Sequence, residues 1–158
     1  MILRIKDYID KFIELLLIIL MGVMVINVLW QVFTRFILND PSSFTDELAR
    51  FILIWLGLLG AGYVTGKKMH LAIDFFLNKF SPKRKRALEL FINVLVFLFA
   101  LFAMFIGGIN LVSLTLYLKQ ISASLQIQLG YVYMVVPLSG FLIMFYSIVN
   151  IIESFKNS

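Results

Sequence analysis

The chain has 158 residues, of which 61% are hydrophobic and 15% are charged, and this composition excludes an ordinary soluble domain. It has no cysteine, which excludes disulfides and thiolate chemistry. Its single histidine, His70, excludes haem and zinc sites that need more than one histidine or cysteine ligand. The net charge of +5 is expected to reflect membrane topology rather than nucleic-acid binding, because cytoplasmic loops of membrane proteins are rich in lysine and arginine.

Four apolar segments follow one another along the chain, and each can supply the roughly 20 residues that a transmembrane helix needs. We expect these helices at about 13–38, 45–66, 88–118 and 128–152. Little chain is left between them. The sequence therefore predicts an all-α integral membrane protein with four transmembrane helices in a single membrane domain, 1–158.

A short amphipathic helix is expected between the second and third spans, over about 69–80. Apolar side chains recur there at spacings of three and four residues, and polar side chains fall between them. This pattern is typical of a helix that lies in the membrane interface. The apolar positions are Met69, Ile73, Phe76, Leu77 and Phe80, and the polar ones include His70, Asp74, Asn78 and Lys79.

The positive charges predict the orientation of the chain. Of the 14 lysines and arginines, only Arg35, Arg50 and Lys119 fall on the side opposite to the termini. Positive residues accumulate on the cytoplasmic side of membrane proteins. We therefore expect a multi-pass membrane protein with both termini and the 67–87 connection in the cytoplasm.

A run of four basic residues, Lys83, Arg84, Lys85 and Arg86, stands where the third span begins. Cations are unfavourable at the positive end of a helix dipole, so helix energetics do not explain them. Anionic phospholipid head groups would, at about 1 kcal/mol per basic residue. A pure topology signal is compatible with the run and is the favoured interpretation, and nucleic-acid binding is not expected because interleaved aromatic residues are missing.

The second span combines a charged start with a stripe of small residues. Glu47 and Arg50 are three residues apart and so adjacent on a helix. Four small residues, Gly57, Gly60, Ala61 and Gly62, fall within six positions. Arg50, Ile54, Gly57 and Ala61 share one face of the helix. Small residues in lipid mark places where another helix comes close. Whether that helix is the fourth span or belongs to another chain stays open.

Other polar residues lie within the spans. Trp55 is near the middle of the second span, where its indole N–H needs a partner unless the ring simply packs. Asn27, Gln31, Asn93 and Asn110 are expected to form hydrogen bonds between helices. No acidic or basic residue lies deep within a span, so this chain alone is not expected to form an ion pathway. No catalytic motif is present, and we expect no enzymatic activity, cofactor or metal site.

Several of these features occur in an order that resembles the small membrane subunit of TRAP (tripartite ATP-independent periplasmic) transporters. The resemblance covers nearly the whole chain. Its residues are Asp46-Glu47-Leu48-Ala49-Arg50, then Trp55, Leu59-Gly60-Ala61, Lys67-Lys68, His70 and Asp74, and finally the aromatic, proline-containing stretch from Tyr131 to Gly140.

The resemblance implies a non-catalytic scaffold for a large, separate permease subunit that moves as an elevator. In such systems the large subunit carries the sodium and substrate sites. A periplasmic solute-binding protein delivers an organic acid, such as a C4-dicarboxylate or sialic acid. By the same resemblance, Glu47, Arg50, Trp55, Gly60 and Ala61 are candidates for the subunit interface, and Lys67, Lys68, His70 and Asp74 for the interfacial helix and lipid.

Two alternatives remain at this point. A homo-oligomeric channel or carrier would place Asn27, Gln31 and Asn110 around a pore. A membrane anchor for a redox complex is the second alternative, although the single histidine argues against a version that binds haem.

Overall fold

The computed structural model describes residues 2–40, 42–67 and 82–156. Within these ranges the chain forms helices and no β-strand. Ile121 and Gln128 pair in a single antiparallel β-bridge. The elements in chain order are α1 (Ile2–Phe36), α2 (Ser43–Gly66), α4 (Pro82–Phe99), the π-helix η1 (Ala100–Ile106), α5 (Gly107–Tyr117), α6 (Leu129–Tyr133) and α7 (Val135–Lys156).

Four segments of the described chain are long and apolar enough to cross a membrane, which confirms the predicted fold class. They run over Arg4–Phe36, Ser43–Gly66, Lys85–Tyr117 and Leu129–Phe155. The third combines α4, η1 and α5, and the fourth combines α6 and α7. The predicted interfacial helix at about 69–80, with Lys68, His70 and Asp74, lies outside the described residues.

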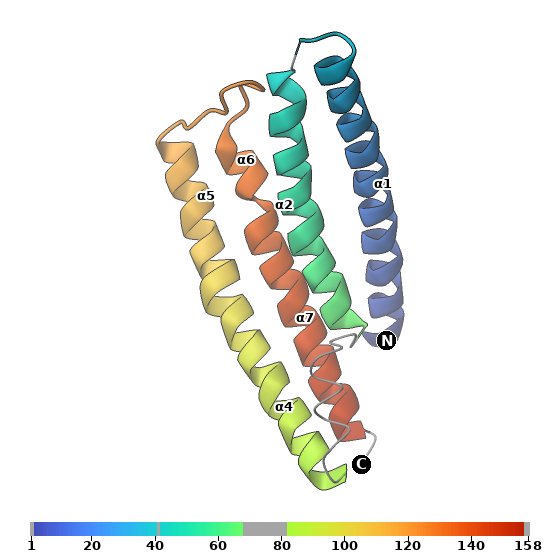
Figure 1. The fold of residues 1–158 in the computed structure, drawn as a ribbon. Coiled ribbons are helices and arrows are strands. Elements are labelled where there is room, and N and C mark those ends of the chain that lie inside the picture. Colours follow the sequence, from blue (N-terminus) through green and yellow to red (C-terminus); the bar gives the residue numbers. More distant parts are fainter. Residues whose placement is uncertain (1, 41, 68–81, 157–158) are drawn as a thin grey trace.

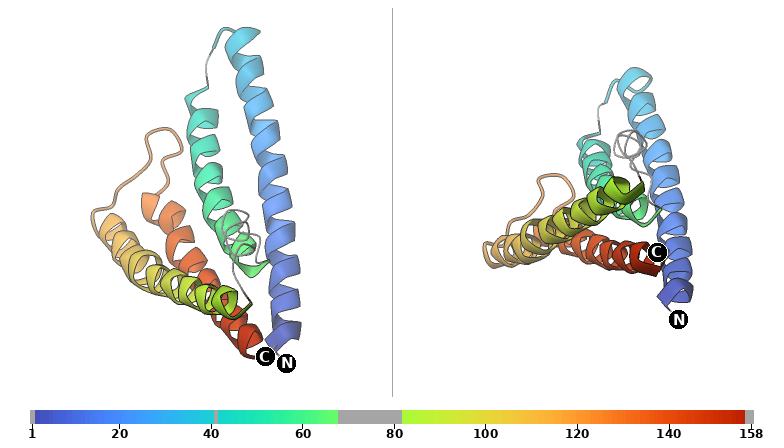
Figure 2. Two further views of the ribbon diagram at one scale, coloured as in Figure 1. Left: turned by 60° about the horizontal axis from the view of Figure 1, so that its bottom comes forward. Right: turned by 90° about the horizontal axis from the view of Figure 1, so that it is seen from below.

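The spans are arranged as a fan (Figures 1 and 2). Helix α2 packs between α1 and α7, and α7 also packs against α4 and η1. The two termini lie at one end of the molecule, where the helices converge, and we call this the terminal end. The opposite end, where the helices spread, carries the connections 37–42 and 118–128, and we call it the loop end.

Helix α7 forms the centre of the packing. In the most apolar stretch of the fourth span, 56% of the residues are buried, whereas 11% are buried in the corresponding stretch of α1. It contributes Ile143 and Met144 to an apolar cluster with Ala100 and Met104 of the third span. It contributes Leu142 and Tyr146 to a second cluster, in which they pack with Ile13 of α1. The first and last helices therefore meet at the terminal end.

Two irregularities shape the third and fourth spans. The fourth is interrupted at Met134, between α6 and α7, and Pro137 follows in the first turn of α7, where its missing N–H is tolerated. The third widens into the π-helix η1 beside α7. There Gly140 allows close approach, since a Cβ on it would lie 2.9 Å from the backbone nitrogen of Phe105.

Candidate subunit interface on helix α2

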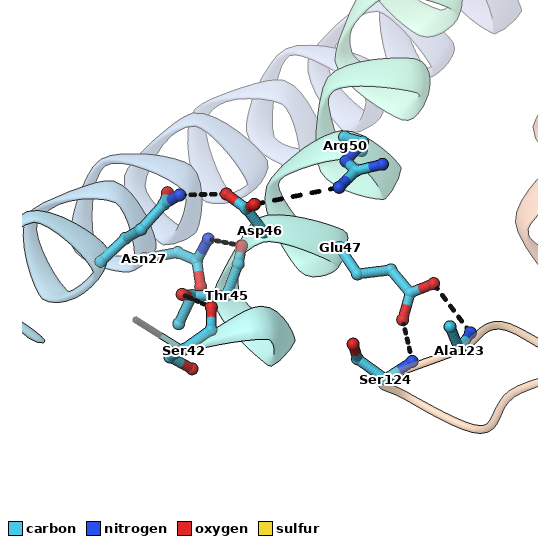
Figure 3. A network of polar contacts seen from close by, with 9 residues as sticks. Asn27, Ser42, Thr45, Asp46, Glu47, Arg50, Ala123 and Ser124 are labelled. Atoms are coloured by element: carbon cyan, nitrogen blue, oxygen red, sulfur yellow. Dashed lines mark hydrogen bonds and ion pairs between the residues drawn. The ribbon is translucent and has the colours of Figure 1, made fainter. Parts of the chain in front are cut away.

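Glu47 binds the loop between α5 and α6. Its carboxylate accepts hydrogen bonds from the backbone N–H groups of Ala123, Ser124 and Leu125, at 3.2, 2.8 and 2.8 Å. Figure 3 shows the bonds from Ala123 and Ser124. Charge-assisted bonds of this kind are stronger than neutral ones. Glu47 thus fixes the loop against α2. The sequence predicted Glu47 at a subunit interface, whereas in the structure its carboxylate is bonded within the chain.

We expect Glu47→Ala to loosen this loop, because three backbone donors lose their acceptor. The measurement is trypsin cleavage after Lys119, an exposed lysine within the loop, followed by mass spectrometry. Cleavage should be several-fold faster than in the wild type. Asp40→Ala is the matched control, since it removes an exposed carboxylate at the same end of the molecule. Equal cleavage rates in both variants would contradict the role of Glu47.

Arg50 is paired with Asp46 rather than with Glu47. The distance from Arg50 Nη2 to Asp46 Oδ2 is 3.9 Å, and both side chains are more than half exposed. Asp46 also accepts a hydrogen bond from the side chain of Gln31, and Asn27 donates to the backbone oxygen of Thr45 at 2.8 Å (Figure 3). These polar contacts join α1 to α2 and leave the Arg50 guanidinium open to its surroundings.

Trp55 faces the interior of the chain. Its indole Nε1 donates a hydrogen bond to the backbone oxygen of Val132, at 3.0 Å. Val132 lies in α6, just before the interruption at Met134. In a continuous helix that oxygen would accept from the N–H four residues later. The break in the fourth span therefore supplies the partner that a tryptophan in the membrane needs.

Removal of this hydrogen bond is expected to lower stability modestly. For Trp55→Phe, which keeps a ring but loses the donor, we expect a loss of about 1 kcal/mol in the free energy of unfolding. The midpoint of thermal unfolding in detergent is the measurement. Trp30→Phe is the matched control, because Trp30 is exposed and only stacks on Phe33. A midpoint lowered equally by both substitutions would rule out a specific contribution of the bond.

The small residues of α2 divide between two faces. A Cβ added to Gly57 or Gly60 would have no atom within 4 Å, and Ala61 is exposed. A Cβ on Gly62 would lie 2.7 Å from Leu142, and one on Gly66 2.6 Å from the ring of Tyr146, both in α7. Close packing within the chain therefore uses Gly62 and Gly66.

The predicted face with Arg50, Ile54, Gly57 and Ala61 is mainly open. Arg50, Gly57 and Ala61 are exposed, and Ile54 is half-buried. Leu53 and Val64, which are also exposed, extend the same surface along α2. We call the set Arg50, Leu53, Gly57, Ala61 and Val64 the open face of α2. The sequence left two possible partners for this face, the fourth span or a helix of another chain. In the structure α7, which belongs to the fourth span, packs on the other side of α2, at Gly62 and Gly66.

At the terminal end, Lys67 forms an ion pair that the sequence did not reveal. Its Nζ lies 3.0 Å from Asp10 Oδ2, and the buried Tyr146 hydroxyl donates to Asp10 Oδ1 at 2.5 Å. The bond to Asp10 raises the pKa of Lys67 above its usual value. The stability that Lys67 contributes is thus fully present at neutral pH and is lost in alkaline solution as the pH rises through its raised pKa.

The basic run at 83–86 lies in the first turns of α4. The guanidinium carbon of Arg86 lies 5.9 Å from the centre of the Phe155 ring in α7. This is a cation–π distance, so Arg86 joins the start of the third span to the end of the fourth. Lys85 of the same run also interacts with another group of the chain. The side chains of Lys83 and Arg84 lie outside the described part of the structure, and lipid binding by the run stays a prediction.

The contacts of Asp10, Tyr146 and Val132 could not be found by sequence reasoning. Their partners lie 57 to 136 residues away along the chain or depend on a helix break. One signal was available for Asp10. It stands three residues before Ile13, on the same face of α1, so an acid shares a face with a core residue.

The sequence matches a family model and several known proteins. A family model described as the DctQ component of tripartite ATP-independent periplasmic transporters matches residues 24–157. The sialic acid TRAP transporter small permease protein SiaQ of Vibrio cholerae is 31% identical over 91 residues, which are 58% of this chain and 53% of SiaQ. The chain thus spans about half the length of that relative.

Two further relatives extend the comparison. A putative TRAP transporter small permease protein of Haemophilus influenzae is 25% identical over 156 residues, which cover 99% of this chain and 93% of that protein. The C4-dicarboxylate TRAP transporter small permease protein DctQ of Vibrio cholerae is 27% identical over 107 residues, or 68% of this chain and 46% of that protein.

The family match covers most of the chain, including all of α2 and its open face. It confirms the resemblance that the sequence motifs indicated. It also agrees with the prediction that the chain is not an enzyme, since the family is a transporter component. The chain therefore belongs to the small membrane subunits, the DctQ component, of TRAP transporters.

Proposed function

We propose that this chain is the non-catalytic scaffold subunit of a sodium-coupled secondary transporter that takes up organic acids. In this proposal a large, separate permease subunit carries sodium and solute and moves as an elevator, and a periplasmic binding protein delivers the solute. Relatives named for sialic acid and for C4-dicarboxylates support these two solute classes. The small subunit holds the large one in the membrane.

The observation that carries the proposal is the open face of α2. Gly57 and Gly60 have free space beside them, so the backbone of a foreign helix can come close there. Asn27 and Gln31 donate hydrogen bonds within the chain, from α1 to α2. Their use inside the chain favours a scaffold over an oligomeric pore lined by these amides.

The proposed location is the bacterial inner membrane, with both termini in the cytoplasm. The distribution of lysine and arginine supports this orientation, because the terminal end carries most of them. The loop end, with the 118–128 connection fixed by Glu47, would then face the periplasm and the binding protein. The 83–86 run would lie near the anionic head groups of the inner leaflet.

Coexpression tests the assignment. The chain is produced with a tag together with the large TRAP permease from the same genome, purified in mild detergent and reconstituted in liposomes. We expect the two subunits to copurify, and we expect sodium-driven uptake of sialic acid or a C4-dicarboxylate only when both subunits and the binding protein are present. Uptake by this chain alone, or sodium or solute bound to it alone, would overturn the proposal.

For the basic run, we expect weaker retention of anionic lipid when Lys83, Arg84, Lys85 and Arg86 are all replaced by glutamine. The reason is the loss of attraction to head groups, about 1 kcal/mol per residue. Native mass spectrometry of the purified chain with phosphatidylglycerol measures the retention. Replacement of Arg4 and Lys6 by glutamine is the control for a general loss of charge. Identical lipid retention in all three proteins would leave the run as a topology signal only.

A further inference from the structure

Helix α1 lies at one edge of the fan (Figure 1), and its axial position needs an explanation. It packs mainly on α2, and most of its surface is exposed. In a membrane, apolar contacts alone discriminate poorly between helix positions, because lipid tails are as apolar as leucine. Ile9, Ile13 and Leu17 all pack in the same cluster and repeat every four residues. A slide by one turn would replace one apolar contact with a similar one.

Polar contacts fix α1 at both of its ends. At the terminal end Asp10 is 6% exposed and bonds to Tyr146 and Lys67, on α7 and just beyond α2. Toward the loop end Asn27 is 7% exposed and donates to the backbone oxygen of Thr45 in α2. An acid and an amide, both buried, therefore hold α1 at two points 17 residues apart.

The same pair of residue types recurs one turn along the helix. Glu14 is four residues after Asp10 and accepts a hydrogen bond from the Tyr63 hydroxyl at 3.3 Å. Gln31 is four residues after Asn27 and donates to Asp46. Both of these contacts are exposed. If α1 moved by one turn toward the terminal end, Glu14 and Gln31 would take the places of Asp10 and Asn27.

We propose that Asp10 and Asn27 select the register of α1 against α2 and α7 from these two alternatives. In the observed register all four polar side chains have partners, and the two shorter ones occupy the buried places. A slide of one turn would move Asp10 and Asn27 out of the two buried places. The longer side chains of Glu14 and Gln31 would then have to fit there. Buried polar groups specify register in other helix assemblies by the same physics, since a misplaced polar group is left without its partner.

This inference is independent of the proposed transport function. The family model begins at residue 24, so Asp10 and Glu14 lie outside the segment that it matches. The contacts concern only this chain. They can therefore be tested without a partner subunit or a solute.

The test uses the absence of cysteine in the chain, which allows two spin labels to be placed without a background. Tyr8→Cys and Leu53→Cys put the labels on exposed positions of α1 and α2. Position 8 lies near the terminal end and position 53 nearer the loop end, so the distance between them reports sliding. Pulsed electron paramagnetic resonance in nanodiscs measures that distance.

We expect one distance in the labelled parent. Asp10→Leu with Asn27→Leu should add a population about 6 Å longer, which is a slide of four residues toward the terminal end. The matched pair, Glu14→Leu with Gln31→Leu, should keep the parent distance, because the buried contacts remain. Parent distances in both double variants, or the same change in both, would overturn the proposal.

A second readout serves if the first double variant is unstable after purification. In native membranes, Ile13→Cys with Leu142→Cys should crosslink in the parent register, since both residues belong to one apolar cluster. In the background with Asp10→Leu and Asn27→Leu, the crosslinking yield of Ile13→Cys should fall, and that of Leu17→Cys with Leu142→Cys should rise above its value in the parent register, where Leu17 packs at the edge of the same cluster. If neither pair crosslinks there, the buried residues are needed for docking of α1 as such, and selection between two registers is wrong.

Discussion

Replacing Gly66 with alanine is expected to lower the free energy of unfolding by about 1–3 kcal/mol, the usual cost of overpacking. The added Cβ would lie 2.6 to 2.7 Å from three ring atoms of Tyr146. That ring cannot move aside easily, because Tyr146 is fully buried and its hydroxyl is bonded to Asp10. Thermal or denaturant unfolding in detergent measures the effect.

Gly22→Ala provides the matched control for this prediction. Gly22 lies within α1, and a Cβ added there would have nothing within 4 Å. Alanine favours a helix over glycine by roughly 0.5–1 kcal/mol, so this variant should be as stable as the parent or more so. If Gly66→Ala is also neutral or stabilising, α2 and α7 do not pack as closely at this point as the structure indicates.

Replacing Gly57 with leucine is expected to act on the partner and not on the fold. No atom lies within 4 Å of a Cβ at this position, so the chain itself has room for the larger side chain. Against a large permease subunit, a leucine on the open face would block close approach of the two backbones. Given the proposed function, we expect recovery of the copurified large subunit to fall at least about fivefold, for a clash of about 1–3 kcal/mol.

Quantitative copurification in mild detergent measures this effect, together with the unfolding midpoint of the small subunit alone. Gly22→Leu is the control, because it adds the same side chain at an equally unobstructed position of α1. Loss of the large subunit in the Gly57 variant only, at an unchanged midpoint, is the expected result. Full recovery with both variants would mean that the open face of α2 meets lipid and that the interface lies elsewhere.

The spans could be predicted from the sequence because they depend on local composition. A run of apolar residues long enough to cross the hydrocarbon core forms a helix wherever it stands in the chain. The interruption at Met134 and the π-helix Ala100–Ile106 are harder to foresee. Pro137 signals an irregular fourth span, but Ala100–Ile106 contains neither proline nor glycine, and its widened turn occurs where the span packs against Gly140 of α7.

The site was only partly predictable, because its contacts depend on which helices are neighbours. Helical spacing placed Gly57 and Ala61 on one face, but it could not tell whether α7 or another chain would meet that face. The structure brings α7 to Gly62 and Gly66 instead. Glu47 was expected beside Arg50 at a subunit interface, and Trp55 was left open between a hydrogen-bond partner and simple packing. In the structure their partners lie in the 123–125 loop and at Val132.

The fan of helices has a consequence for the two leaflets of the bilayer. Because the spans converge at the terminal end and spread at the loop end, the molecule has the outline of a wedge (Figure 2). A wedge displaces more lipid area from one leaflet than from the other. Embedded in a membrane in this arrangement, the chain would respond to the lateral pressure in each leaflet, and lipids with small head groups would fit beside its wider end.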